Sequence, residues 1–275
     1  MIAHTLLRGP GRVVPGWFPL VVEPVGRHLP PPPSPAEEPV NGGRMLLDLD
    51  DYVQRKIWYR SFEPVAARTL RRLLRRGDAA FDIGANVGFY TLLFATCVGP
   101  SGSVHAFEPV NGDAIDRNVE LSGLENVVLS RVAAGAEAGS VLIGRRTNFE
   151  GRSSGAWRRG PTLDAVEVEQ IALDDYVEAH VPGRIRLVKI DVEGMEPDVL
   201  AGLRTTLAAG RVDALLVEVA GEAMDDPGPV LEPLQRAGYR VSRLGPFGGR
   251  RRPGPSFDAK LTGLYHLLAV RPGAA

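Results

Sequence analysis

An acid and two glycines lie where a predicted strand meets a predicted helix, in the sequence AAFDIGANVGFYT at residues 79–91. Asp82 lies near the end of an apolar run, and Gly84 and Gly88 follow before the pattern becomes apolar and helical. Glycine lets the backbone turn sharply and approach a ligand with no Cβ atom in the way, and Asn86 tolerates left-handed conformations. A helix beginning near Gly88 directs free N–H groups and the positive end of its dipole to the same place. The stretch therefore predicts a turn that binds a ligand.

A second acid, Glu108, ends the next predicted strand, VHAFEP, 20 residues after Gly88. The carboxyl ends of parallel strands share one edge of a sheet, where ligands bind in open α/β folds. A carboxylate there can accept hydrogen bonds from both hydroxyls of a ribose. We therefore expect a nucleoside-like ligand.

Asp82 indicates which nucleoside-like ligand is bound. The glycine spacing is G-x-x-x-G rather than the G-x-G-x-x-G typical of dinucleotide sites, and a carboxylate beside a pyrophosphate would be repelled by it. S-adenosylmethionine carries an ammonium, a sulfonium and one carboxylate, so an acid suits its amino-acid end. We therefore favour S-adenosylmethionine over NAD. A helix-start acid with no ligand would also explain Asp82, but it would not explain its pairing with Glu108.

The sequence KIDVEGME at residues 189–196 supplies the candidate catalytic groups. It follows another predicted strand and so opens onto the same edge as the cofactor turn. We expect Asp191 and Glu193 to face the acceptor, one of them as a base or orienting group. Lys189 would pair with a carboxylate or lower the pKa of the acceptor hydroxyl, and the alternative is that it is only a buried ion-pair partner. For Glu196 we favour a charge at a helix N-terminus.

A metal ion is an open alternative. Asp191, Glu193 and Glu218 would offer oxygen ligands to Mg²⁺ if the fold brought them together, although we expect no metal by default. His266, in the last predicted strand, is a less favoured candidate for the base.

The elements that must position these residues form an alternating series. Short apolar strands alternate with amphipathic helices, which is typical of a parallel sheet covered on both faces. A final helix-free pair, 239–244 and 261–270, predicts an antiparallel hairpin at one edge. Residues 165–171 alternate like an edge or hairpin strand, and the Arg/Gly-rich segment 144–161 predicts a long loop. The predicted strands are 79–83, 103–109, 126–133, 185–191 and 212–219, and the predicted helices are 64–76, 88–97, 111–121, 196–209 and 229–237.

Residues 1–43 form a separate segment that ends in a proline run, LPPPPSPAEEP. Consecutive prolines favour extended polyproline II structure without internal hydrogen bonds. We therefore predict an N-terminal arm or linker at 1–43 and one folded domain at 44–275.

Composition narrows the function classes. The chain has 275 residues, 44% hydrophobic and 24% charged, with a formal net charge of −1, so no global field attracts nucleic acid. The single cysteine, Cys97, excludes an internal disulfide framework and a cluster of several thiolates. No apolar run approaches the roughly 20 residues that span a bilayer, and the proline-broken N-terminus does not resemble a signal peptide. We expect a cytoplasmic enzyme without a transmembrane segment or a nucleic-acid partner.

The motifs FDIGANVGFYT, VHAFEP, LDDYV, IRLVKIDVEGMEPDVLAGL and ALLVEV, in this order, resemble the FkbM-type methyltransferases over roughly residues 45–240. The resemblance implies a Rossmann-like, seven-stranded class I methyltransferase sheet. It implies transfer of a methyl group from S-adenosylmethionine to a hydroxyl of a sugar, glycolipid or polyketide-type product of secondary metabolism. Asp82, Gly84, Asn86 and Gly88 would contact the amino-acid part of the cofactor and Glu108 the ribose, with Asn111 and Ala133 near the adenine. The arm and the loops at 144–161 and 245–258 would choose the acceptor.

Two other function classes stay open. An NAD-dependent oxidoreductase would need a Tyr-x-x-x-Lys pair, which Tyr90, Tyr176, Tyr239 and Tyr265 do not provide. A catalytically inactive Rossmann-like binding protein is the other alternative. The full set of residues that we expect to bind the cofactor is Asp82, Gly84, Ala85, Asn86, Gly88, Tyr90, Thr91, Glu108, Pro109, Asn111 and Ala133.

Overall fold

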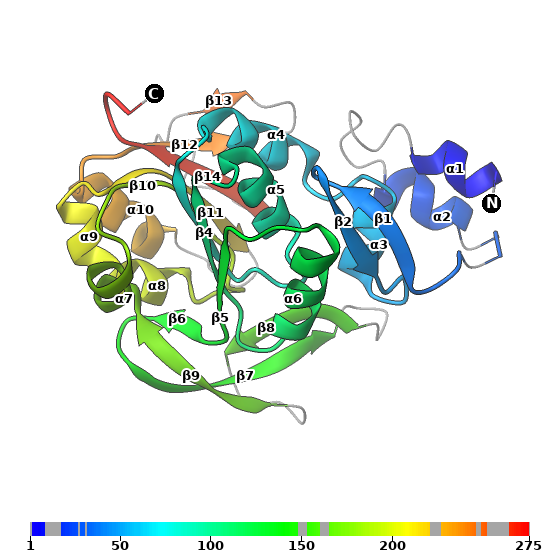
Figure 1. The fold of residues 1–275 in the computed structure, drawn as a ribbon, viewed down its shortest axis with the longest axis horizontal. Coiled ribbons are helices and arrows are strands. Elements are labelled where there is room, and N and C mark those ends of the chain that lie inside the picture. Colours follow the sequence, from blue (N-terminus) through cyan, green and yellow to red (C-terminus); the bar gives the residue numbers. More distant parts are fainter. Residues whose placement is uncertain are drawn as a thin grey trace.

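A mixed β-sheet forms the centre of the protein in the computed structural model (Figure 1). The structure describes residues 2–8, 18–26, 28–30, 32–147, 153–159, 165–220, 227–245, 249–251 and 264–274. The strand order is β13-β12-β14-β11-β10-β3-β4-β5. The strands are β3 (Ala79–Ile83), β4 (Ser103–Phe107), β5 (Val127–Ser130), β10 (Ile185–Ile190), β11 (Val212–Ala220), β12 (Arg240–Leu244), β13 (Arg250–Arg251) and β14 (Leu264–Val270).

This sheet confirms the expected α/β fold with seven principal strands, to which the two-residue β13 adds a short edge. Strands β5, β4, β3, β10 and β11 are parallel to one another. Strands β12 and β14 pair antiparallel, as the hairpin prediction requires. Strand β14 also lies between β12 and β11 and pairs antiparallel with β11. The last strand of the chain is thereby placed next to the strand that ends in Glu218.

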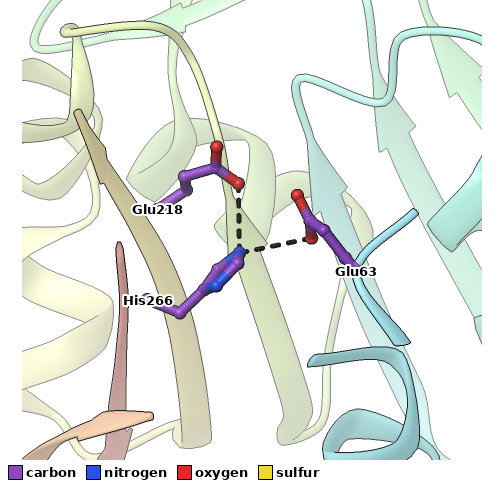
Figure 2. Close-up of side chains that lie close together, drawn as sticks. All are labelled: Glu63, Glu218 and His266. Atoms are coloured by element: carbon purple, nitrogen blue, oxygen red, sulfur yellow. Dashed lines mark hydrogen bonds and ion pairs between the residues drawn. The ribbon is translucent and has the colours of Figure 1, made fainter. Parts of the chain in front are cut away.

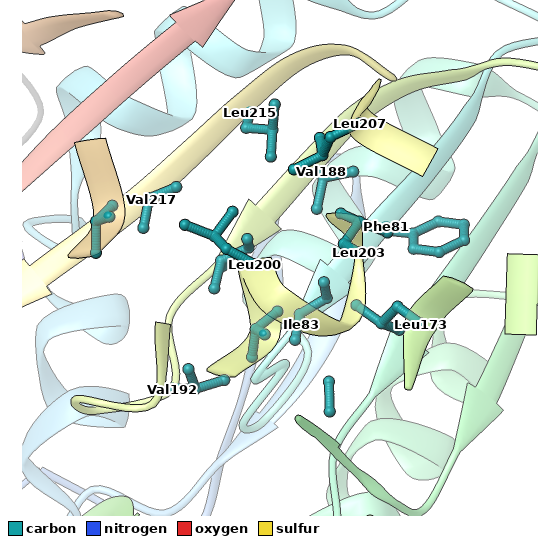
Figure 3. Close-up of a cluster of buried hydrophobic side chains, with 14 of the residues drawn as sticks. Phe81, Ile83, Leu173, Val188, Val192, Leu200, Leu203, Leu207, Leu215 and Val217 are labelled. Atoms are coloured by element: carbon teal, nitrogen blue, oxygen red, sulfur yellow. The ribbon is translucent and has the colours of Figure 1, made fainter. Parts of the chain in front are cut away.

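Helices cover both faces of this sheet. On one face, α4 (Pro64–Leu73) and α5 (Phe89–Val98) pack against side chains that include Ala80 and Leu187. On the other face, Phe81 and Ile83 pack against leucines and valines of α7 (Leu173–His180), α8 (Glu196–Gly202), α9 (Arg204–Ala208) and α10 (Gly228–Arg236) (Figure 3). Successive residues of a strand point to opposite faces, so the charged residues of β3 and β10 can be assigned to a face from these neighbours. Helix α6 (Gly112–Leu121) follows β4.

The prediction of a long loop at 144–161 is wrong wherever the structure describes this segment. Strands β7 (Gly139–Thr147) and β8 (Ser153–Arg159) pair antiparallel, and residues 148–152, 160 and 161 lie outside the described residues. Strands β7 and β8 belong to a four-stranded sheet of order β6-β9-β7-β8, with β6 (Ala133–Gly135) and β9 (Val166–Ala172). The intrinsic β-strand propensity of this Arg/Gly-rich segment is low, and its strands form because they pair with neighbouring strands. The predicted strand 126–133 is likewise divided between β5 of the large sheet and β6 of the small one.

The N-terminal segment forms regular elements in its described parts. These are α1 (Ile2–Arg8), the π-helix η2 (Phe18–Val22), α2 (Glu23–Gly26) and β1 (Ala36–Val40), which pairs antiparallel with β2 (Gly43–Leu47) ahead of α3 (Tyr52–Trp58). Glu38 on β1 accepts from Arg8 Nη2 at 2.5 Å and from Trp58 Nε1 at 3.0 Å. The segment is therefore tied to the chain that follows it, and the boundary at residues 43 and 44 stays a prediction.

None of the helices in the described residues has the length and apolar character needed to cross a bilayer.

Candidate functional site

The turn between β3 and α5 has a backbone that favours glycine. Gly84, Asn86 and Gly88 have φ angles of 73°, 51° and 88°. A Cβ atom at Gly84 would lie 1.9 Å from the carbonyl oxygen of Asp191, so no side chain can be accommodated there without movement. The Asp191 N–H also donates to the Ile83 carbonyl at 3.1 Å. The turn after β3 is therefore locked against the turn after β10.

Glu108, which directly follows β4, is held by backbone amides. Its carboxylate accepts from the N–H groups of Asn86 at 2.9 Å, Val110 at 3.0 Å and Asn111 at 3.0 Å. The residue is only 5% exposed, and burial raises its pKa although these hydrogen bonds oppose the shift. A carboxylate offers about four acceptor positions, so about one is left for a ligand. Glu108 thus presents a fixed acceptor.

A pocket opens at the carboxyl ends of β3, β4 and β10. Its wall includes Glu108 and apolar side chains such as Ile143 and Met195. Seven of the predicted site residues line it: Gly84, Asn86, Glu108, Pro109 and Ala133 from the cofactor set, and Asp191 and Glu193 from the catalytic set. The fold therefore brings members of both expected groups, the cofactor set and the catalytic set, to one cavity.

The other predicted cofactor residues are not on the wall of this pocket. Asn111 precedes α6, and its Nδ2 donates to Asn86 Oδ1 at 3.2 Å. Ala85 packs in a small cluster with Ala106 and Ile115. Gly88, Tyr90 and Thr91 belong to the N-terminus and first turn of α5, where Tyr90 is 3% and Thr91 0% exposed.

Asp82 has a different position from the one expected. Its side chain is fully buried and is not part of the pocket wall. One oxygen, Oδ2, accepts from the Thr91 hydroxyl at 2.6 Å, and Oδ1 lies 3.7 Å from Lys189 Nζ. Strand alternation explains this, because Phe81 and Ile83 face α7–α10 whereas Ala80 and Asp82 face α4 and α5. Burial raises the pKa of Asp82 even though Lys189 opposes the shift.

Lys189 connects the two turns. Its Nζ donates to the Gly84 carbonyl at 3.0 Å and lies 3.1 Å from Asp191 Oδ2. Burial alone would lower the pKa of Lys189, but Asp191, Asp82 and further carboxylates outweigh it and raise the pKa. Lys189 therefore pairs with carboxylates on both sides, and the raised pKa favours its ammonium form.

A third group of polar residues lies on the α4/α5 face of the same sheet (Figure 2). Strand register places Glu218 of β11 directly opposite His266 of β14. His266 Nε2 lies 3.1 Å from Glu218 Oε2 and 3.2 Å from Oε2 of Glu63, the residue before α4. Burial would lower the pKa of His266, but Glu63 and Glu218 raise it well above its ordinary value.

This group differs from the metal set considered in the sequence. Among the described residues, the ligand atoms of Glu63, Glu218 and His266 lie within 4.8 Å of one another, and this group contains neither Asp191 nor Glu193. Sequence reasoning gave Glu63 no role, since its only local signal is its place before Pro64 at the start of a helix. Glu218 and His266 were considered separately, but their pairing depends on the strand order.

Comparison with known proteins shows the family. The family model described as the methyltransferase FkbM domain matches residues 82–241. Hexuronic acid methyltransferase AglP of Haloferax volcanii is 28% identical over 174 residues, which are 62% of this chain and 66% of AglP. The 31-O-demethyl-FK506 methyltransferase FkbM of Streptomyces tacrolimicus is 30% identical over 163 residues, 47% of this chain and 61% of that protein. The chain thus spans a little under two thirds of the length of these relatives.

Solved structures also resemble the chain, at low identity. An S-adenosylmethionine-dependent O-methyltransferase of Thermotoga maritima has a TM-score of 0.42 at 16% identity, covering 76% of this chain and 65% of that one. Fibrillarin of Aeropyrum pernix, solved with natively bound S-adenosylmethionine, has a TM-score of 0.42 at 15% identity, covering 75% and 74%. Likeness at this level carries no information about activity. The family match covers more than half of the chain, including the glycine turn, Glu108 and the KIDVEGME segment, and the chain therefore belongs to the FkbM methyltransferase domain family.

Proposed function

We propose that the protein is an S-adenosylmethionine-dependent O-methyltransferase that acts on a hydroxyl of a sugar, glycolipid or polyketide-type natural product. The observation that carries the proposal is the carboxylate of Glu108, fixed by three backbone amides on the wall of a pocket that begins at the Gly84 turn. A hydrogen-bond acceptor that is fixed in place, beside a glycine with no side chain to block the approach of a ligand, suits a ribose. Membership of a methyltransferase family favours S-adenosylmethionine over NAD as the nucleoside-containing ligand.

The pocket residues suit each part of this cofactor. Glu108 would accept from the ribose, and the apolar wall around Ala133 and Ile143 would receive the adenine. Besides Glu108, the pocket wall carries the carboxylates of Asp191 and Glu193, so one of these two rather than Asp82 would attract the cationic amino-acid end. Asp82 would then act indirectly, because Lys189 lies between it and Asp191. This assignment revises the expected direct grip by Asp82.

When bound, the cofactor would supply an electrophilic methyl group on its sulfonium. The chain must hold the acceptor oxygen in line with that group, and alignment of this kind can contribute up to roughly 7–11 kcal/mol in the best cases. The acceptor hydroxyl must also lose its proton, and we propose that it passes to whichever of Asp191 and Glu193 does not contact the amino-acid end. Lys189 orients Asp191 and limits its movement.

The acceptor class rests on the relatives. One is named for a hexuronic acid and another for FK506, so a sugar or a polyketide-type product is the acceptor that they suggest. We place acceptor recognition in the part of the small sheet of β6, β9, β7 and β8 that lies beyond Ala133 and Ile143, because this sheet borders the pocket. A cytoplasmic location and the absence of a nucleic-acid substrate stay predictions.

Calorimetry with S-adenosylhomocysteine, S-adenosylmethionine and NAD tests the cofactor. Wild type should bind S-adenosylhomocysteine with micromolar affinity. Glu108→Ala should weaken this binding by roughly 10- to 100-fold, the loss expected for a charge-assisted hydrogen bond. Glu120→Ala, which removes an exposed acid of α6, is the matched control and should bind like wild type. Binding of NAD without S-adenosylhomocysteine would refute the proposal.

Radiolabelled methyl transfer tests the reaction and the acceptor. A panel of uronic acids, glycolipids, macrolide alcohols and total RNA is offered to the wild-type protein. We expect label in a sugar or macrolide fraction as an alkali-stable ether. Label in RNA, or an alkali-labile ester, would contradict the proposed acceptor class.

A further inference from the structure

Glu63, Glu218 and His266 come from three distant parts of the chain and converge on one point (Figure 2). Glu63 precedes α4, Glu218 belongs to β11 and His266 to β14. Their side chains are 11%, 9% and 16% exposed. Glu63 has a left-handed backbone with a φ of 38°, which is uncommon for a residue other than glycine. The fold thus maintains an unfavourable backbone conformation where this carboxylate faces the imidazole.

The spacing of the three groups resembles that of ligands around a metal ion. Neighbouring ligands at bond lengths of about 2.0–2.2 Å and right angles are separated by about 3 Å. His266 Nε2 lies 3.1 Å from one carboxylate oxygen and 3.2 Å from the other. Both carboxylates use their Oε2 atoms, so one ion could contact all three groups with little side-chain movement.

The charge balance gives an independent reason for a cation. Four carboxylates, those of Glu63, Asp82, Asp191 and Glu218, act electrostatically on the single ammonium of Lys189. With all four carboxylates ionised and an imidazolium at His266, the described residues of this cluster would carry an excess of two negative charges, and burial opposes that state by raising the pKa of Asp82 and of Glu218. Buried charge without compensation is costly, and the cost falls if a divalent cation is present.

We propose that Glu63, Glu218 and His266 bind a divalent first-row transition-metal ion. Two carboxylates and an imidazole form a mixed oxygen and nitrogen set, which suits Mn²⁺, Fe²⁺, Co²⁺ or Zn²⁺ better than Mg²⁺ or Ca²⁺. The Tyr90 hydroxyl donates to Glu63 Oε2 at 2.5 Å and would orient this ligand. The site shares Glu218 with the Asp191, Glu193 and Glu218 set considered for Mg²⁺ but contains neither Asp191 nor Glu193, and it does not depend on the proposed methyl transfer.

The test uses the full chain, stripped with a chelator and freed of any affinity tag. Mn²⁺ and Co²⁺ are titrated in separate experiments, with calorimetry for both and visible absorption for Co²⁺, whose bands report its ligands. We expect one site per chain and an affinity for Mn²⁺ above that for Mg²⁺. Glu63→Gln, Glu218→Gln and His266→Gln should each weaken binding by at least about 30-fold, and Tyr90→Phe by roughly 10- to 100-fold.

Glu193→Gln is the control variant, because Glu193 lines the cofactor pocket and is not part of the proposed ligand set. It should bind the metal like wild type. S-adenosylhomocysteine affinity and thermal unfolding, measured on every variant, separate loss of a ligand from loss of the fold. These readouts also distinguish failure of this proposal from failure of the cofactor assignment.

Three results would overturn the proposal. One is a folded wild-type protein that binds neither Mn²⁺ nor Co²⁺, which would leave an imidazolium between two carboxylates as the explanation of the geometry. Another is binding that Glu193→Gln removes and His266→Gln leaves intact. The third is a preference for Mg²⁺ over Mn²⁺, which would speak against a nitrogen ligand.

Discussion

Asp82 and Lys189 are direct neighbours in the register of β3 and β10, and their charged groups lie 3.7 Å apart in the core. Lys189 also pairs with Asp191 on the pocket wall. A buried charge whose partner is removed costs about 3–5 kcal/mol. Asp82 is therefore linked to the pocket through the cation that it shares with Asp191.

Lys189→Met should lower the free energy of unfolding by about 3–5 kcal/mol, because Asp82 and Asp191 lose their cation. In the double variant Asp82→Asn/Lys189→Met, one of the two carboxylates left without a cation is also removed. Its loss of unfolding free energy should therefore be smaller than the sum of the two single losses by about 0.5–3 kcal/mol. Urea unfolding of the four proteins measures this coupling. Strict additivity would show that the two residues do not interact.

Gly84→Ala should destabilise the protein and weaken S-adenosylhomocysteine binding, since its Cβ atom would meet the Asp191 carbonyl. Gly123→Ala is the matched control, with a left-handed φ of 60° and nothing within 4 Å of the added carbon. The control should lose only about 1–2 kcal/mol, the cost of the backbone conformation. Chemical denaturation and calorimetry compare the two. Equal losses would mean that the contact with Asp191 is unimportant.

Glu196→Gln should change how stability depends on pH. Burial raises the pKa of Glu196 from 4.5 to about 7, and Asp191 adds to the shift although N–H groups, including that of Gly194, oppose it. Because the folded state holds this proton more tightly than the unfolded state, the stabilisation is complete below about pH 4.5 and is lost as the pH rises through about 7.

The free energy of unfolding of Glu196→Gln relative to wild type should therefore rise between pH 4.5 and pH 7.5, by an amount on the order of 3 kcal/mol. Urea unfolding at half-unit pH intervals measures the difference. A constant difference across this range would show that the pKa of Glu196 is not raised in the folded protein.

Glu38→Ala should destabilise the N-terminal segment. It removes the ion pair with Arg8 and the hydrogen bond from Trp58 Nε1, both partly buried, for which about 1.5–3 kcal/mol is expected. Glu37→Ala removes the exposed pair with Arg44, whose side chains are 42% and 54% exposed, and should cost less than about 1 kcal/mol. Hydrogen exchange of α1 and β1 provides the measurement. Similar protection in both variants would argue against the anchoring role of Glu38.

Most of the parallel part of the large sheet could be predicted because β3, β4, β10 and β11 are short apolar runs, and the next element after each is a helix. The pairing of β7 with β8 could not, since it joins Arg/Gly-rich segments without apolar alternation. The direction of Asp82 was also not readable from sequence. Apart from Asp82 itself, strand β3 is apolar on both faces, so its sequence does not say toward which face Asp82 points. The place of Glu63 beside His266 depends on a contact between the two ends of the domain, for which no local pattern exists.

The contact between Gly84 and Asp191 has a practical consequence for altering this protein. The loop that would hold the methyl donor and the loop that would face the acceptor share a backbone contact that leaves no free space, so neither can be redesigned alone. Variants with a new acceptor range should therefore keep both turns fixed and place their substitutions on the small sheet, away from Ile143, which borders the cofactor pocket.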